Sequence, residues 1–207
     1  IKQIIALVGD PGMFAIGLLV ILTGLWVVHR DRKAGLKIRP KYFGWMLAES
    51  TAYAVVVAFI VSRLVGALYY NVAPVTALAA AQVELPLSKM LALSLGAGLY
   101  EELVFRVFLV GGLFWVFSRV RRRTKPVVEG AAPPRDIPAY LAAAILGAIV
   151  FSAVHYVGAY GDPFQLPSFT FRFLFGLALN ALFLLRGFGI AAWTHAIYDV
   201  LVVTNTL

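Results

Sequence analysis

Four side chains with acid–base chemistry lie in stretches of sequence that are otherwise apolar. Glu101 and Glu102 stand together in the run YEELVFR, His155 ends the run FSAVH, and His195 lies in WTHAIYD. A carboxylate and a neutral imidazole that converge on a water molecule can remove its proton and direct the oxygen at a carbonyl carbon. A second imidazole can donate a hydrogen bond to the resulting oxyanion. These residue types therefore suit hydrolysis of an amide bond.

The run YEELVFR also places Arg106 in an apolar stretch. A charged residue near the centre of a membrane helix costs roughly 2.5–3.5 kcal/mol, whereas an apolar residue returns only about 0.3–0.6 kcal/mol. Glu102 and Arg106 are four residues apart on one helix face, so we expect them to form an ion pair. Glu101 lies about 140° from Arg106 around a helix and points elsewhere, which makes it the candidate base.

His195 and Asp199 are also four residues apart. They share a helix face, and Asp199 could fix the tautomer and the orientation of the imidazole. Each histidine taken alone is more simply a hydrogen-bonding residue between helices. Two carboxylates and two histidines on three apolar helices are harder to explain by packing, because small and hydroxyl residues join membrane helices at lower cost. We therefore expect one shared site.

Four other interpretations of these residues compete with this one. The chain has no cysteine, and no serine stands in an evident nucleophile motif, so a covalent acyl-enzyme is disfavoured. Two histidines and a carboxylate resemble catalytic zinc ligation, but the HExxH spacing is missing, so we expect no cofactor and keep zinc as the less favoured alternative. A transporter would show matched halves or inverted repeats, which are not evident. A non-catalytic membrane scaffold is the remaining rival.

Composition identifies the environment. Of 207 residues, 61% are hydrophobic and 14% are charged, and the mean hydropathy is +0.87. A soluble domain of this length carries nearly twice that share of charge, so an integral membrane protein is expected. The net charge of +8 lies mainly between the apolar stretches. It indicates contact with anionic lipid headgroups and not with nucleic acid.

The sequence predicts an all-α, polytopic transmembrane bundle of about six spans. They lie at about 11–28, 42–69, 88–117, 137–157, 169–185 and 188–203. The tight Arg186-Gly187 turn predicts that the last two pack as an antiparallel pair. Residues 72–87 suggest a surface-lying or re-entrant segment, and the Pro-rich 127–138 stretch suggests a flexible connector.

Orientation follows from the basic residues. The loops after the first and third spans are rich in Lys and Arg, whereas loops 70–87 and 158–168 contain neither. We expect the basic loops to be cytoplasmic and both termini to face outward, in a prokaryotic inner (plasma) membrane. Arg63 and Arg172 are expected to extend toward an interface, and Asn180 to hydrogen-bond between helices. Glu49, beside the cytoplasmic boundary, needs no function.

Three motifs occur in order on successive predicted helices. Residues 101–106 read EExxxR, 151–155 read FxxxH from Phe151, and 195–199 read HxxxD. This set resembles the CPBP family, which comprises CAAX proteases and the bacteriocin-processing enzymes also called Abi proteins. The resemblance covers about residues 87–204, and the first two spans match only in general character. We therefore divide the chain into N-terminal spans, 1–86, and a catalytic four-helix core, 87–207.

The resemblance implies a glutamate-dependent intramembrane endopeptidase. It implies that Glu101 and His155 activate water, that His195 and the residue at Asp199 form an oxyanion site, and that Glu102, Arg106 and Phe151 support them. The eukaryotic CAAX endopeptidases carry Asn where this chain has Asp199. An ionised Asp cannot donate a hydrogen bond, so Asp199 either carries a proton or, as we expect, orients His195 instead. The expected substrate is a membrane-anchored or exported peptide or protein.

Overall fold

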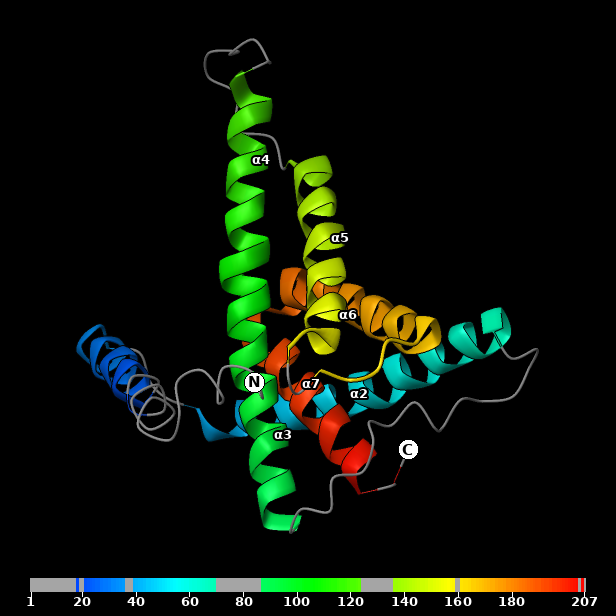
Figure 1. Cartoon of the computed structure of the whole chain (residues 1–207). Coiled ribbons are helices and arrows are strands. Elements are labelled where there is room, and N and C mark those ends of the chain that lie inside the picture. The colour runs from blue at the N-terminus through cyan, green and yellow to red at the C-terminus, as the bar shows by residue number, and fades with distance from the viewer. Residues whose placement is uncertain are drawn as a thin grey trace.

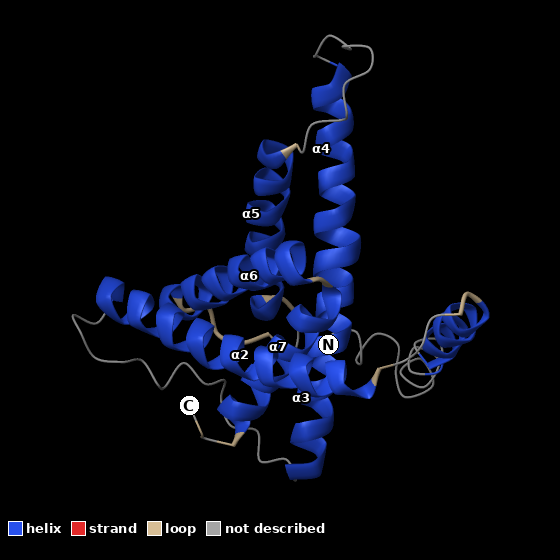
Figure 2. Ribbon diagram, turned by 180° about the vertical axis from the view of Figure 1, so that it is seen from behind, coloured by secondary structure: helices blue, strands red, loops and turns tan. Residues whose placement is uncertain are grey.

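A computed structural model describes residues 18, 21–35, 39–69, 87–123, 136–158, 161–204 and 206. Within this part of the chain every regular element is a helix, as the all-α prediction requires (Figures 1 and 2). Residues 21–33 form a first helix. The others are α2 (Pro40–Tyr69), α3 (Leu87–Glu102), the π-helix η1 (Leu103–Val110), α4 (Gly111–Arg123), α5 (Ile137–Ala153), the 3₁₀ turn η2 (Val154–Tyr156), α6 (Leu166–Arg186) and α7 (Phe188–Val203).

Among the residues that the structure describes, four helical stretches are long and apolar enough to cross a membrane. They are Pro40–Tyr69, Leu87–Arg121, Ile137–Tyr156 and Leu166–Arg186. α7 is apolar but has only 16 residues, fewer than the roughly 20 that a perpendicular span needs. Of the predicted first span at 11–28, residues 18 and 21–28 are described and the remainder lies outside the described residues. The predicted surface segment falls almost wholly outside them too, as does most of the Pro-rich connector.

The third predicted span is longer than expected and is not a uniform α-helix. α3, η1 and α4 follow one another without a break and form the longest helical rod in the described part of the chain, drawn in green (Figure 1). Its middle eight residues are π-helical, a widened form that is rare and often found at functional sites. α5 runs beside α4 and also contacts η1 (Figure 1). Gly147 of α5 lies against Val110, where a side chain would not fit.

α7 occupies the centre of the bundle and packs against α3, α2 and α6. Its approach to α3 is unusually close. A Cβ atom added to Gly98 would lie 2.6 Å from the backbone oxygen of Ala192 and 2.6 Å from Cβ of Ala196. Only glycine permits this contact, and small residues of this kind bring membrane helices together. The crossing lies one turn before the two glutamates, so it fixes how near they come to α7.

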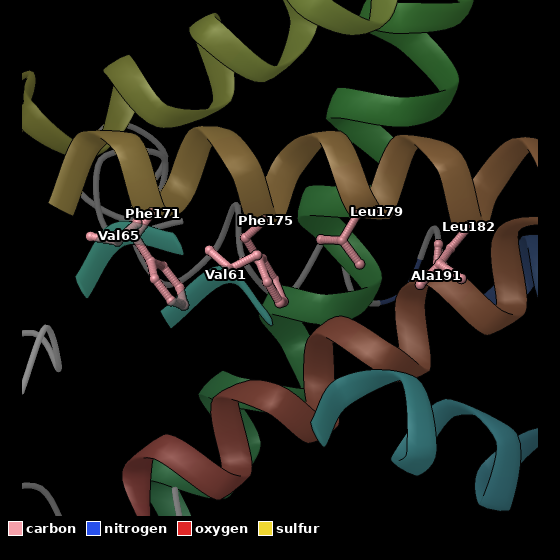
Figure 3. Close-up of a cluster of buried hydrophobic side chains, with 7 residues drawn as sticks. All are labelled: Val61, Val65, Phe171, Phe175, Leu179, Leu182 and Ala191. Carbon is pink, nitrogen blue, oxygen red and sulfur yellow. The ribbon is translucent and has the colours of Figure 1, made fainter. Parts of the chain in front are cut away.

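A buried hydrophobic cluster joins α2, α6 and α7 (Figure 3). Its members are Val61, Val65, Phe171, Phe175, Leu179, Leu182 and Ala191. The rings of Phe175 and Tyr198 lie 4.3 Å apart between centroids. Close to their turn, α6 and α7 are in contact at Leu182 and Ala191, and at their far ends they are in contact at Phe171 and Tyr198. This arrangement confirms the predicted antiparallel pair. Gly187 makes the turn with φ of +90°, a conformation that favours glycine.

Polar side chains add two further links between helices. Asn180 of α6 donates from Nδ2 to the backbone oxygen of Ala144 on α5 at 2.9 Å, so its predicted role between helices is confirmed. Arg186 donates two hydrogen bonds to Glu49 of α2, at 2.6 and 2.7 Å. This pair ties the C-terminal end of α6 to the first half of α2, far along α6 from the candidate site.

Candidate active site

The close crossing of α3 and α7 brings a carboxylate against an imidazole. Nδ1 of His195, in the middle of α7, lies 2.8 Å from Oε1 of Glu102, the last residue of α3. Glu102 is fully buried and His195 is 4% exposed. An ionised carboxylate can only accept, so the ring carries its proton at Nδ1 and donates it to Glu102. This bond fixes both the position and the tautomer of His195.

Glu102 has a second partner, and the predicted ion pair is confirmed. Nε of Arg106 lies 2.9 Å from Oε2 of Glu102, and neither side chain is exposed. The guanidinium carbon lies 4.8 Å from the ring centroid of Phe151, a cation–π contact from α5. Glu102 therefore binds both Arg106 and His195, and these three side chains form the buried part of the site.

The other ring nitrogen of His195 faces two more carboxylates. Nε2 lies 3.7 Å from Oδ2 of Asp199 and 3.9 Å from Oε2 of Glu101. Both distances exceed hydrogen-bond reach, although they leave strong Coulomb attraction to a charged ring. The prediction that Asp199 orients His195 is therefore corrected, because Glu102 makes the orienting bond. A motif read along one helix could not reveal a partner 93 positions away.

His155 lies in η2, the single 3₁₀ turn that ends α5. Its Nδ1 lies 2.8 Å from the backbone oxygen of Phe151, one turn earlier. A carbonyl oxygen only accepts, so Nδ1 carries the proton and Nε2 of the neutral ring keeps its lone pair. His155 thus has the tautomer that a base acting through Nε2 requires.

Phe151 connects the two histidines. Its ring centroid lies 5.1 Å from that of His155 and 5.9 Å from that of His195, both edge-to-face. Phe105 contacts the same ring at 5.1 Å. The structure therefore brings α5 to the α3–α7 crossing, and Phe151 contacts one charged or titratable residue from each motif: Arg106, His155 and His195.

Exposure divides the site into an inner and an outer part. The side chains of Glu102 and Arg106 are fully buried, whereas those of Glu101 and Asp199 are 13% and 28% exposed. The site therefore has a fully buried side, formed by Glu102 and Arg106, and a partly exposed side, formed by Glu101 and Asp199. Within the described ranges, no three His, Asp or Glu side chains are grouped so as to hold a metal ion.

Sequence reasoning missed several neighbours. Phe175 packs edge-to-face on His195 at 5.7 Å, and Phe105 packs on Phe151. Arg172, predicted to extend toward an interface, binds Asp162 of the 158–168 loop at 2.7 Å, a partner that the sequence did not indicate. The aromatic residues carry no signal that separates them from ordinary core packing. Asp162 had one signal, since it is the single charged residue in the short 158–168 loop.

The sequence pattern of the type II CAAX prenyl endopeptidase Rce1-like family matches residues 83–201. The chain belongs to this family. The matched segment contains the EExxxR, FxxxH and HxxxD motifs and more than half of the chain, and it confirms the resemblance to CPBP intramembrane proteases. Comparison with curated proteins and with solved structures found no match. In general terms, the Rce1-like family and the apolar helices identify a membrane-embedded protease of CAAX type.

Proposed function

We propose that this chain is an endopeptidase that hydrolyses a peptide bond of a membrane-associated protein or peptide within the helix bundle. The observation that carries the proposal is the convergence of three carboxylates on one buried imidazole. Glu102, Asp199 and Glu101 lie 2.8, 3.7 and 3.9 Å from the nitrogens of His195. A packing role does not require such a cluster, because each buried charge must first be taken out of water.

In the proposed reaction, Glu101 and Nε2 of His155 act on water. One of them accepts a proton while the water oxygen bonds to the carbonyl carbon of the scissile peptide. The carbonyl oxygen becomes an oxyanion. When the C–N bond breaks, the same proton passes to the leaving nitrogen, so the products are a carboxyl group and an amine. The Nδ1–H of His155 that binds Phe151 supports the base role, because it leaves the lone pair on Nε2.

His195 is proposed to stabilise the oxyanion. Its Nδ1–H is held by Glu102, so a doubly protonated ring presents Nε2–H toward the accessible side of the site. Three nearby carboxylates favour the positive charge of that ring, and Arg106 offsets part of their own charge. Asp199 helps to hold the ring charged without bonding to it. Preorganised donors of this kind contribute several kcal/mol to acyl-transfer reactions, about 2.7–4 kcal/mol for one donor.

The substrate class follows from the family description and from the membrane setting. CAAX substrates end in a prenylated Cys, two aliphatic residues and a variable residue. A prenyl chain anchors such a peptide to the bilayer, where a site inside a helix bundle can receive it. A membrane-anchored or exported peptide without a prenyl group is the second class that this setting allows.

The test uses the purified chain in lipid vesicles with two probes. One probe is a farnesylated peptide ending in a CAAX sequence, and the other has a membrane-spanning anchor and no prenyl group. Mass spectrometry is expected to find a new carboxyl terminus on at least one probe. The Glu101→Ala and His155→Ala variants should abolish that product, whereas Glu49→Gln, which breaks a distant ion pair, should not. Product that persists in both active-site variants contradicts the mechanism, and no product from wild type on either probe favours the scaffold.

Metal dependence is tested on the same preparation. We propose that the reaction needs no metal ion, since a carboxylate and an imidazole suffice to activate water. Turnover of the cleaved probe is therefore expected to stay within twofold of its starting rate after prolonged treatment with a chelator. Loss of activity that zinc restores would replace this proposal by zinc-dependent hydrolysis.

A further inference from the structure

We propose that Asp162 and Arg172 form a clamp that positions His155 for catalysis. The clamp consists of Tyr156, Asp162, Ser168 and Arg172. It rests on the proposed function, because it acts through the proposed base. Neither charged residue belongs to the three motifs, and both are positioning residues that do not touch the reacting atoms.

The backbone around His155 needs an external partner. η2 ends at Tyr156, and the carbonyl groups of a helix end have no partner within the helix. The backbone N–H of Asp162 supplies one, donating to the oxygen of His155 at 2.8 Å. Two glycines permit this close approach of Asp162 to His155. Gly158 takes a φ of +89°, and a Cβ added to Gly161 would lie 2.8 Å from the carbonyl carbon of Tyr156.

Side chains then fix Asp162 itself. Nη2 of Arg172, in the second turn of α6, donates to Oδ2 of Asp162 at 2.7 Å. Nη1 donates to Oγ of Ser168 at 3.0 Å, and the hydroxyl of Tyr156 donates to the same oxygen at 2.8 Å. The guanidinium carbon also lies 5.1 Å from the ring centroid of Tyr156. One arginine therefore joins the loop, the start of α6 and the residue that follows His155.

Partial burial gives these contacts their strength. The Arg172 and Asp162 side chains are 17% and 27% exposed, so the pair is less screened than one on an open surface. Charge-assisted hydrogen bonds are roughly twice as strong as neutral ones. With Arg172 removed, Asp162 would keep a partly buried charge without its partner, and the loop would lose its hold on the backbone of His155.

The ring position depends on this backbone. The bond from Nδ1 of His155 to Phe151 spans the junction between α5 and η2, so it holds only while the 3₁₀ turn keeps its geometry. A displacement of about 1 Å in a catalytic group can cost up to 10²-fold in rate. The clamp is therefore expected to affect turnover more than substrate binding.

The experiment compares Asp162→Asn, Arg172→Gln and the double variant in vesicles, with the cleaved probe peptide. Each single variant is expected to lower kcat about tenfold and to leave KM within twofold. Because the two residues act on one another, the double variant should lose no more than either single one. Glu49→Gln is the matched control, since it breaks the other ion pair that α6 makes and should leave kcat unchanged.

Two further variants separate positioning from loss of fold. Tyr156→Phe removes only one hydroxyl from the clamp and should lower kcat about threefold at an unchanged melting temperature. Arg172→Lys keeps the charge without the forked geometry and should recover part of the lost kcat. The chain has three histidines, so ¹⁵N-histidine labelling resolves the ring of His155. In wild type the ring of His155 should be in the Nδ1–H form, and in Arg172→Gln it should show a mixture of the two tautomers.

The outcomes distinguish the clamp from the proposed function. If Glu101→Ala abolishes cleavage while Asp162→Asn and Arg172→Gln keep kcat within twofold, the clamp is wrong and the mechanism stands. Effects that multiply to about a hundredfold in the double variant would also overturn the clamp. If Glu101→Ala and His155→Ala leave cleavage intact, the proposed function fails first. A ¹⁵N spectrum of His155 unchanged in Arg172→Gln contradicts the clamp directly.

Discussion

At the scale of single residues, the site is a sequence of charges that alternate in sign. Arg106 binds Glu102, Glu102 binds His195, and the far nitrogen of His195 faces Asp199 and Glu101. Each buried charge has an opposite neighbour, which is the condition for keeping ionised groups inside an apolar bundle. The same order places a potential donor, Nε2–H, at the accessible end.

Arg106 and Glu102 are expected to depend on one another for stability. Arg106→Met should lower the free energy of unfolding by about 3–5 kcal/mol, because it leaves the fully buried Glu102 without its cationic partner. Thermal unfolding in detergent measures the loss. The double variant with Glu102→Gln should recover much of it, since Gln can still accept from Nδ1 of His195. A double variant that is less stable than Arg106→Met would contradict the pairing.

Residue chemistry was predictable from the sequence where partners share one helix. The spacing from Glu102 to Arg106 predicted their ion pair, which the structure contains at 2.9 Å. The orienting partner of His195 was not predictable, because it depends on how two helices cross. Arg172 shows the same limit, because its partner Asp162 comes from a loop and the position of Arg172 on its helix does not indicate that contact.

At the scale of elements, the crossing of α3 and α7 sets the site geometry. Gly98 lets the two backbones touch one turn before the glutamates. The π-helix η1 follows at once and carries Arg106 in the same rod. Its wider turns shift every later residue relative to a regular α-helix, so η1 also sets where α4 meets α5.

Substitution of Gly98 is expected to open this crossing. In Gly98→Ala the new methyl group would lie 2.6 Å from backbone and side-chain atoms of α7, so the helices must separate. We expect a loss of about 1–3 kcal/mol in stability and a longer Glu102 to His195 contact. Gly96→Ala, on the same helix with nothing within 4 Å, is the matched control. Melting temperature and turnover of the cleaved probe are measured for both variants. Equal values for Gly98→Ala and Gly96→Ala would contradict the role of Gly98 in the crossing.

Hydropathy predicted most elements and missed two features. The apolar stretches located α2, α5 and α6 to within a few residues. Hydropathy could not show that Leu103–Val110 is π-helical, because that form arises from packing against neighbours and not from composition. The shortness of α7 was visible in the 188–203 boundary, but its central place depends on contacts with three other helices.

At the scale of the whole molecule, basic residues gather at one end of the long rod. Arg119, Arg121, Arg122 and Arg123 close α4 at the end where α5 begins (Figure 1). The opposite end of α5 carries His155 and leads to a loop without Lys or Arg. We propose that the α4 end faces the cytoplasm and the His155 end faces outward, which places both termini outward in an inner membrane with six spans.

Single cysteines test this orientation, because the chain has none of its own. Arg122→Cys and Phe164→Cys introduce a thiol beyond either end of α5, and Phe164 is 64% exposed. In intact cells a membrane-impermeant thiol reagent should label Phe164→Cys and should reach Arg122→Cys only after the membrane is opened. The reverse pattern would invert the orientation, and labelling of both positions in sealed cells would refute the span between them.

The most direct measurement of the central claim is the single-turnover rate of Glu101→Gln. This change keeps the size of the side chain and removes its capacity to accept a proton. Loss of a general base typically costs about 10²–10⁴-fold, so the rate on the cleaved probe should fall by at least a hundredfold with binding unchanged. Glu49→Gln in parallel should keep the wild-type rate. A Glu101→Gln enzyme that cleaves within tenfold of wild type would contradict water activation by Glu101.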